Sequence, residues 1–354
     1  MQSKYKKCFL NLLLLSISVL FSIGILEIYA INFLKIPYYT LDSNFTVLDD
    51  ELTRGYKVND EKIGFLPGPE WFGREGILGC QNGREYLKNK KAALKIVILG
   101  DSVIQNRYLE KSLKFILKDM HYEIFNAGIG AYNTMQEAYY LKEHIAVPFN
   151  ILILGFCLND FEPPYTIIIA NNKEKFARNL FEPLGHVNPF LFRNSALYRY
   201  FKIRTINLLK KEEIWSKEAV LKNKDVKEGL QGILKYCDSK NAKLFVIIYP
   251  HLESYRKDSF LEAAHEKIIE ILNELKINFL DLHEVYKNYD YKNLIQNQQD
   301  TCHPNFYADF IAAREFLNRF YSQLGLTKEY IANSNNLSFD QSALEGFEKS
   351  NSSR

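Results

Sequence analysis

Four side chains of this sequence belong to the types that carry out acyl transfer: Ser102, Asn159, Asp300 and His303. A serine becomes a nucleophile when a neighbouring base removes its proton. Histidine has a suitable pKa for that task, and a carboxylate can hold its ring in the required tautomer. An asparagine amide can donate a hydrogen bond to the oxygen that gains charge when a carbonyl is attacked. If the fold brings these four side chains together, they predict a serine-dependent acyl-transfer site.

Short apolar runs place the serine and the asparagine at the ends of strands. The runs are rich in Ile, Val, Leu and Phe, as strands buried on both faces are, and they lie at 94–99, 122–126, 150–155, 243–249 and 277–281. Amphipathic segments, which predict helices, lie between them at 107–119, 134–146, 225–240 and 256–275. Ser102 follows the first run and Asn159 follows the third. Ligands of parallel α/β sheets bind outside the carboxyl ends of the strands, so we expect an α/β fold with the site at that edge.

A glycine-containing loop and a histidine before a helix complete the set. The loop after the second predicted strand contains Gly128 and Gly130, and such a loop can expose backbone N–H groups towards a neighbouring site. Pro304 suits the first turn of a helix. We therefore expect His303 on a loop at the start of the last helix, where it can reach Ser102.

These pieces resemble the sequence blocks of the SGNH (GDSL-type) hydrolase family, and they occur in the order of that family. Gly100-Asp101-Ser102 resembles the nucleophile block, residues 155–160 resemble the block that supplies an oxyanion asparagine, and residues 300–303 resemble the Asp-x-x-His block. The resemblance implies a three-layer α/β/α fold of flavodoxin-like type with a five-stranded parallel sheet.

The resemblance, which covers residues 94–323, also implies the catalytic roles. Ser102 is expected to be the nucleophile, His303 the base and Asp300 the acid that orients the base. This chemistry requires no cofactor and no metal, and no histidines of the chain show the spacing of metal ligands.

The oxyanion hole implied by the resemblance has three donors: the backbone N–H of Ser102, the side chain of Asn159 and the backbone N–H of Ala131. The glycine that the family uses for the third donor falls on Ala131 in this chain, and the neighbouring Gly130 is the alternative donor. An alanine can serve only if the loop needs no positive φ at that position.

The N-terminus predicts a membrane segment. Lys4, Lys6 and Lys7 precede an apolar stretch from residue 8 to about residue 34, which is long enough to span a bilayer. The lysines favour a cytoplasmic N-terminus, so the rest of the chain is expected in the periplasm or at the cell surface. A cleaved signal peptide is the alternative, and it places the domain in the same compartment.

Composition shifts divide the chain into four parts. They are a stub with a signal-anchor helix at 1–35, a linker and irregular lead-in at 36–93, an α/β domain at 94–325 with a helical insertion at 161–242, and a polar tail at 326–354.

Charge and cysteine content limit the partners. The 45 basic and 42 acidic residues give a net charge of +3, and no basic stripe with interleaved aromatics occurs, so nucleic acid is not an expected partner. Cys80, Cys157, Cys237 and Cys302 would meet an oxidising compartment, where disulfides can form. Cys157 and Cys302 are expected near the site, either as buried thiols or as a pair.

Together these features predict a membrane-anchored serine esterase that removes O-acyl groups, acetyl above all, from a cell-envelope glycan or similar ester through an acyl-serine intermediate. An O-acyltransferase that moves the acyl group to a sugar hydroxyl would need the same residues. A non-catalytic envelope assembly or binding protein is the third alternative, against which intact Ser102, Asp300 and His303 argue. The sequence indicates no oligomeric state.

Overall fold

The computed structural model of the chain describes residues 2–33, 57–60, 63–67, 76–88, 94–130, 132–161, 165–170, 173–178, 191, 194–198, 200–201, 217–251, 259–297, 300–335 and 339. The chain forms two compact units. Unit 1 comprises Met1–Arg54, Val58–Phe65 and Thr166–Glu212, and unit 2 comprises Gly55–Lys57, Leu66–Tyr165 and Glu213–Arg354.

A five-stranded parallel sheet forms the centre of unit 2. Its strands are β3 (Leu94–Gly100), β4 (Tyr122–Gly128), β5 (Ile151–Cys157), β8 (Lys243–Tyr249) and β9 (Asn278–Asp281), and their spatial order is β4-β3-β5-β8-β9. All four pairings are parallel. The five predicted strands and the fold class are thus confirmed. The order reverses between β3 and β5, and this switch point is where sheets of this topology bind ligands.

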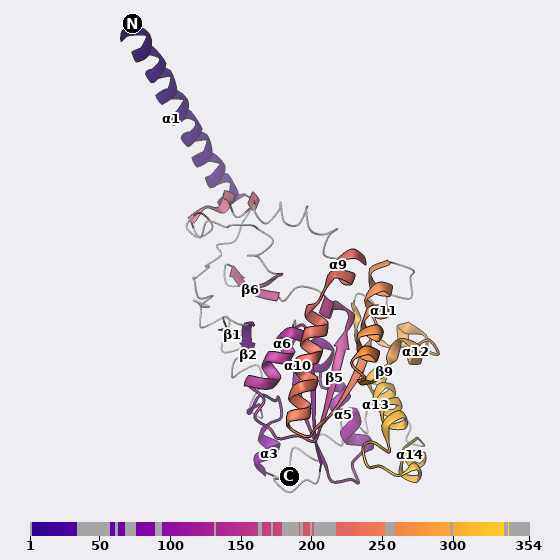
Figure 1. Cartoon of the computed structure of the whole chain (residues 1–354). Helices are drawn as coiled ribbons and strands as arrows, with labels where there is room; N and C mark the ends of the chain where they lie inside the picture. Colours follow the sequence, from indigo (N-terminus) through magenta and orange to yellow (C-terminus); the bar gives the residue numbers. More distant parts are fainter. Residues whose placement is uncertain are drawn as a thin grey trace. The chain divides into compact units, whose positions relative to one another are not determined.

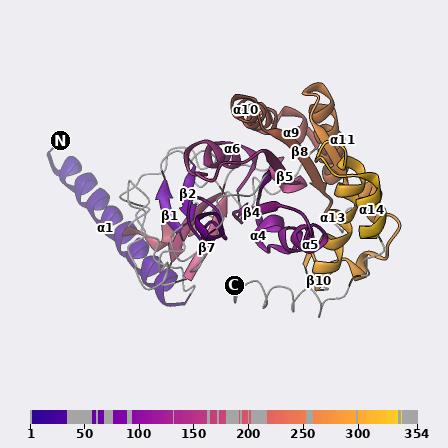
Figure 2. The same cartoon turned by 90° about the horizontal axis from the view of Figure 1, so that it is seen from below.

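Helices cover both faces of this sheet (Figure 1 and Figure 2). One face carries α6 (Thr134–Glu143), α10 (Asp225–Ser239) and α11 (Ser259–Glu274), and the other carries α5 (Tyr108–Ile116) and α13 (Phe306–Phe320). This arrangement gives three α/β/α layers, because strands buried on both faces require a helical layer on each side.

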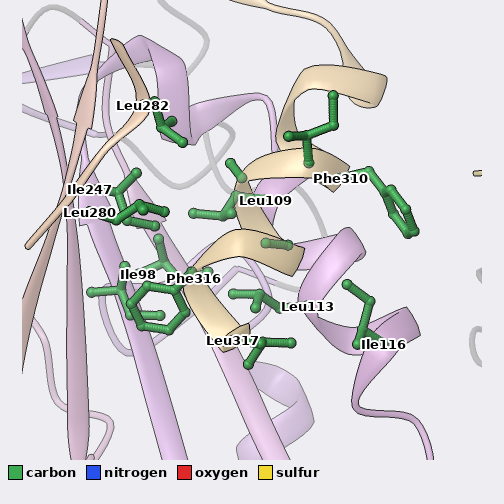
Figure 3. Packing of buried hydrophobic residues seen from close by; sticks show 14 of the residues in the cluster. Ile98, Leu109, Leu113, Ile116, Ile247, Leu280, Leu282, Phe310, Phe316 and Leu317 are labelled. Atoms are coloured by element: carbon green, nitrogen blue, oxygen red, sulfur yellow. The ribbon is translucent and has the colours of Figure 1, made fainter. Parts of the chain in front are cut away.

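The core between the sheet and α5 and α13 is formed by aliphatic and aromatic side chains (Figure 3). Leu113 of α5 and Phe316 of α13 are fully buried and point towards Ile98 and Ile247 of the sheet. Burial of each such side chain stabilises the fold by about 1.5–3 kcal/mol. The strands are therefore held firmly in place behind the site.

Part of the expected irregular lead-in packs on the sheet. Residues 76–88 end in the short helix α3 (Arg84–Lys88), and Gln81 and Asn82 before it are buried. The Gln81 amide donates hydrogen bonds to Asn126 Oδ1 at 3.0 Å and to the carbonyl of Gly128 at 3.2 Å. This segment therefore braces the end of β4, next to the predicted site.

Two expectations about the later chain were incomplete. Inside the range 161–242, expected to be helical, β6 (Tyr165–Ala170) and β7 (Lys173–Arg178) form a two-stranded sheet before α9 (Lys217–Lys222). Three consecutive isoleucines in β6 favour a strand because β-branched side chains fit a pleated surface.

The polar tail is also more ordered than expected at its start. Residues 328–335 form the helix α14 (Lys328–Asn335), whose Ile331 is buried against the core. The hydroxyl of Tyr330 donates a hydrogen bond to the carbonyl of Ile116 at 2.7 Å. The adjacent residues Tyr330 and Ile331 attach this segment to the core, although most residues around them are polar.

Unit 1 begins with α1 (Gln2–Asn32). Of the described residues, Phe9–Asn32 forms the one helix long and apolar enough to cross a membrane, with 24 residues and a mean hydropathy of 2.4. Its Ser16, Ser18 and Ser22 hydroxyls donate to backbone carbonyls one turn earlier, which satisfies them within the helix. By length and composition α1 fits either a membrane anchor or a signal sequence.

Candidate active site

Ser102 is the first residue of the one-turn helix α4 (Ser102–Gln105), which starts directly after β3. Asp101 caps this turn, because its Oδ1 accepts a hydrogen bond from the backbone N–H of Val103 at 3.0 Å. Ser102 itself stays partly exposed, whereas Val103 and Ile104 are buried beneath the turn. The sequence thus folds locally into a buried support with the hydroxyl of Ser102 at its rim.

A row of three glycines allows α4 to pack closely on the sheet. Gly100 pairs with Gly128 on one side and with Gly155 on the other, so the row crosses β4, β3 and β5 at their carboxyl ends. A Cβ atom at Gly128 would lie 2.5 Å from the backbone nitrogen of Gln105, and one at Gly155 would lie 2.4 Å from Ile104 Cδ1. The absence of side chains here lets the backbone of α4 approach the sheet, which positions Ser102.

Asp300 and His303 lie together on a short hairpin before α13. β10 (Ile295–Asn297) pairs antiparallel with β11 (Asp300–Pro304). Asn305 ties this hairpin to the helix, because its side-chain amide donates to the carbonyl of Ile295 while its Oδ1 accepts from Ala308 N–H. We expected His303 on a loop at the start of the helix, but it lies on the strand β11. Pro304 is the last residue of that strand, and Asn305 is the N-cap of α13.

Ser102, His303 and Asp300 form a continuous chain of hydrogen-bonding atoms. His303 Nε2 lies 2.8 Å from Ser102 Oγ, and His303 Nδ1 lies 2.8 Å from Asp300 Oδ2. Asp300 Oδ1 also accepts the backbone N–H groups of Cys302 and His303, at 3.2 and 3.1 Å. The structure thus brings together three residues that lie up to 201 positions apart in the sequence.

The charges around the hairpin shift both titratable groups. Burial alone raises the pKa of Asp300, but hydrogen bonds from the backbone and ring of His303 outweigh it and lower the pKa overall. For His303, burial favours the neutral ring, whereas the negative charges of Cys302 and Asp300 favour the protonated ring, and the net result is a raised pKa. A carboxylate beside an imidazole of raised basicity is the electrostatic arrangement that a general base requires.

Asn159 lies beside the nucleophile turn, on the 3-10 turn η2 (Leu158–Phe161) that follows β5. Its side-chain amide donates to Asp101 Oδ2 at 3.3 Å. Burial, followed by the charge of Cys302, raises the pKa of Asp101 to about 6. Asp101 therefore caps the Ser102 turn with one carboxylate oxygen and accepts a hydrogen bond from the Asn159 amide with the other.

The third expected oxyanion donor, Ala131, lies outside the described residues. The alternative donor, Gly130, comes close to the nucleophile, because a Cβ atom at Gly130 would lie 3.6 Å from Ser102 Cβ. Its backbone N–H, however, donates to Gln105 Oε1 at 3.0 Å. Gly130 would have to exchange this hydrogen bond in order to bind an oxyanion.

The two cysteines expected near the site are in contact as free thiols. Cys157 Sγ, at the end of β5, lies 3.9 Å from Cys302 Sγ. A hydrogen bond from Cys157, together with His251 and His303, lowers the pKa of the Cys302 thiol, while the same contact and burial raise the pKa of Cys157. The Cys302 thiol is one of the groups that raise the pKa of His303, a contribution that the sequence did not reveal.

Glu137 of α6 is a buried acid near the site that the sequence analysis missed. Its carboxyl oxygens are buried and have no hydrogen-bond partner among the described residues. Burial and the neighbouring charge of Asp101 raise its pKa well above the ordinary range. A glutamate inside a helix is normally exposed to solvent, and no signal in the sequence indicates that Glu137 is buried.

Within the described part of the chain, no three His, Cys, Asp or Glu side chains are placed to hold a metal ion together. No protein-family model matches the chain, and no curated protein matches it.

Solved structures of several hydrolases are similar to this chain in fold. LAE5, an α/β hydrolase from the metagenome of Lake Arreo in Spain, has 12% identity and a TM-score of 0.42, over 64% of this chain and 94% of its own. The acetylxylan esterase Axe2 from Geobacillus stearothermophilus has 14% identity and a TM-score of 0.41, over the same 64% and 94%. An acylhydrolase assigned in Bacteroides fragilis has 12% identity and a TM-score of 0.39, over 72% of this chain and 99% of its own. At these TM-scores the likeness assigns no family to this chain.

Proposed function

We propose that the protein is a serine esterase of the SGNH type, with Ser102 as nucleophile, His303 as general base and Asp300 as the acid that orients it. The observation that carries the proposal is the unbroken chain from Ser102 Oγ through the His303 ring to the Asp300 carboxylate, with 2.8 Å at each contact. Such a chain is the arrangement that activates a serine hydroxyl.

The proposed reaction has two halves. As Ser102 Oγ attacks an ester carbonyl, its proton passes to His303 Nε2, and the carbonyl oxygen becomes an oxyanion. His303 then gives this proton to the leaving alkoxide oxygen, the bond between carbonyl carbon and alcohol breaks, and an acyl-serine remains. A water molecule, deprotonated by His303, attacks the acyl-serine and releases the carboxylic acid and the free hydroxyl of Ser102. Asp300 holds Nδ1–H throughout and stabilises the imidazolium.

Two donors beside Ser102 are proposed to bind the oxyanion: its own backbone N–H and the Asn159 side chain. Asn159 donates to Asp101 in the structure, so its amide is already oriented by a buried partner. Ala131 remains our proposed third donor.

We propose an O-acylated glycan of the cell envelope, with acetyl as the acyl group, as the substrate. The support is the apolar span Phe9–Asn32 with the lysines before it in α1, which would hold the catalytic domain on the outer side of a cytoplasmic membrane. Transfer of the acyl group to a sugar hydroxyl would follow the same steps as hydrolysis up to the acyl-serine, and it would differ only in the group that then accepts the acyl.

Active-site labelling tests the proposal. We expect a fluorophosphonate probe to label the purified full-length protein at Ser102, and the Ser102→Ala variant to remain unlabelled. Ser239→Ala, which removes an exposed hydroxyl that donates to the carbonyl of Tyr236, is the matched control and should label normally. A folded wild-type protein that neither reacts with the probe nor releases p-nitrophenol from p-nitrophenyl acetate would instead favour a non-catalytic binding protein.

Product analysis then separates hydrolysis from transfer. Incubation with p-nitrophenyl acetate should yield free acetate in the presence and absence of a xylo-oligosaccharide acceptor. Acetylated oligosaccharide as the main product would identify the protein as a transferase.

A further inference from the structure

Within unit 1, a carboxylate near the end of α1 contacts a segment about 170 positions later in the chain. Glu27 accepts hydrogen bonds from the Ser195 hydroxyl at 2.8 Å, from the backbone N–H of Leu197 at 3.1 Å and from the backbone N–H of Ala196. Ser195 Oγ in turn accepts the backbone N–H of Tyr198 at 3.0 Å. Both carboxylate oxygens of Glu27 are therefore occupied by donors from one short stretch of chain.

An apolar contact lies beside this polar one. Ala30, one turn after Glu27, and Ala196 are both fully buried, and Leu197 and Tyr200 pack against them. Small side chains allow two backbones to approach closely. We call residues 194–198, 200 and 201 the docking segment.

The depth of Glu27 in the apolar helix points to the membrane surface. Phe9 begins the apolar stretch, and Glu27 follows 18 residues later, which corresponds to about 27 Å at 1.5 Å per residue. A bilayer has a hydrocarbon core of about 30 Å. With the lysines before Phe9 at the inner surface, Glu27 and Ala30 reach the outer boundary of the hydrocarbon.

Several exposed side chains next to the contact are apolar or aromatic, although Asn194 and Asn32 are also exposed. Phe201 is 59% exposed and Leu191 is 41% exposed, and on α1 the stacked rings of Tyr29 and Phe33 are also exposed. Aromatic side chains are enriched at the headgroup level of membranes. This surface continues the lipid-facing surface of α1, which identifies the bilayer as its partner.

We propose that Glu27 holds the docking segment against the outer end of α1, and that Leu191 and Phe201 thereby lie in the outer interface of the membrane. A carboxylate at this depth is costly unless its acceptors are satisfied, and the two amides and the hydroxyl satisfy them. α1 then acts as a folding partner of the docking segment as well as a tether. This proposal rests on the retention of α1 as an anchor, which is part of the proposed function.

Cysteine crosslinking in the membrane tests the contact. In the full-length protein in phosphatidylcholine–phosphatidylglycerol vesicles, Ala30→Cys combined with Ala196→Cys should form a crosslink with a short bismaleimide, identified by mass spectrometry of the joined peptides. Ile28→Cys with Ala196→Cys is the matched control, because Ile28 is 62% exposed on another face of the helix. A 28–196 yield equal to that of the 30–196 pair would contradict the docking.

Substitution of Glu27 tests its role in the same background. We expect Glu27→Leu to lower the 30–196 crosslink about tenfold, as the loss of several hydrogen bonds to a charged group implies. Glu27→Gln keeps one acceptor oxygen but places an amide N–H2 group where the other oxygen accepted, so its yield should fall between those of Glu27 and Glu27→Leu. An unchanged yield in Glu27→Leu would overturn the proposal, as would an intact mass showing that α1 is removed from the mature chain.

A fluorophore tests the contact with lipid. NBD attached to Phe201→Cys should be quenched by spin-labelled lipid and not by a soluble quencher of the same kind; a label that only the soluble quencher reaches would overturn the assignment of the bilayer as partner. Phosphonate labelling of Ser102 in the same samples reports the esterase separately. Loss of docking with labelling retained therefore overturns this proposal and leaves the proposed function standing.

Discussion

The two regions that meet at the candidate site are built in different ways. The nucleophile turn, Gly100 to Gln105, rests on the glycine row and on the buried side chains of Val103 and Ile104. The acid–base hairpin, β10 and β11, is held by hydrogen bonds among its own backbone, Asp300 and Asn305. Packing therefore positions the serine, whereas local hydrogen bonding and charge position the histidine.

The acids of the two regions show the same difference. Asp101, in the nucleophile turn, is fully buried, and its pKa is raised to about 6. The Asp300 side chain, in the hairpin, is 30% exposed, and its pKa is lowered by the N–H groups it accepts. We infer that the nucleophile turn is sensitive to changes in volume and the hairpin to changes in charge.

The largest effect is expected from a charge change in the hairpin. Asp300→Asn keeps the shape of the side chain but cannot hold His303 in the tautomer that accepts the serine proton. We expect kcat for p-nitrophenyl acetate to fall about 10³–10⁴-fold, with little change in the thermal unfolding midpoint. A fall of less than tenfold would show that Asp300 does not orient the base.

A smaller loss is expected from the donor beside the nucleophile turn. Asn159→Ala removes the proposed oxyanion donor, and kcat should fall about 10²–10³-fold while KM changes little. Steady-state kinetics on a series of acetate esters measures both constants. A change confined to KM would mean that Asn159 binds substrate and transition state equally.

A volume change in the glycine row should act on stability and activity together. The Cβ of Gly128→Ala would meet the backbone of α4, so we expect a loss of about 1–3 kcal/mol in the free energy of unfolding and a fall in kcat of about tenfold or more. Urea denaturation and kinetics of the same sample measure both quantities.

Gly232→Ala is the matched control for this substitution. Gly232 lies in α10, and its new Cβ would lie 3.7 Å from Ala138 Cβ of α6, an ordinary van der Waals contact, so stability should be unchanged or slightly higher. Equal behaviour of the two variants would contradict the role of the glycine row.

The smallest effect is expected from Cys302→Ser, which removes a thiol of lowered pKa that contributes to the raised pKa of His303. His303 must be neutral to act as base, so kcat/KM should rise with pH through its pKa, which the neighbouring charges raise above 6.5. Without the contribution of Cys302 this pKa falls, so the acid limb should move to lower pH while the maximal rate changes less than about tenfold. A limb that stays in place would show that Cys302 does not affect the base.

Much of the architecture could be predicted from local patterns. Each of the five apolar runs became a strand of the sheet, because a run of β-branched and aliphatic residues between turn residues has few other stable states. The positions of Ser102 and Asn159 after β3 and β5 followed from these runs. The helix α14 was missed because its burial depends on core residues that are distant in the sequence, whereas the isoleucines of β6 were a local signal that was overlooked.

The sequence by itself determined the order of the strands along the chain and the chemical types of the residues after them. Both follow from local features, namely the apolar runs and the turn residues that end them. Only the tertiary structure decided which groups share one electrostatic environment. The contact of Cys157 with Cys302, the burial of Glu137 near Asp101 and the docking of Glu27 on Ser195 all join distant parts of the chain. The physical reason is that packing and hydrogen bonding depend on distance in space, and this distance is set only when the strands and helices are assembled.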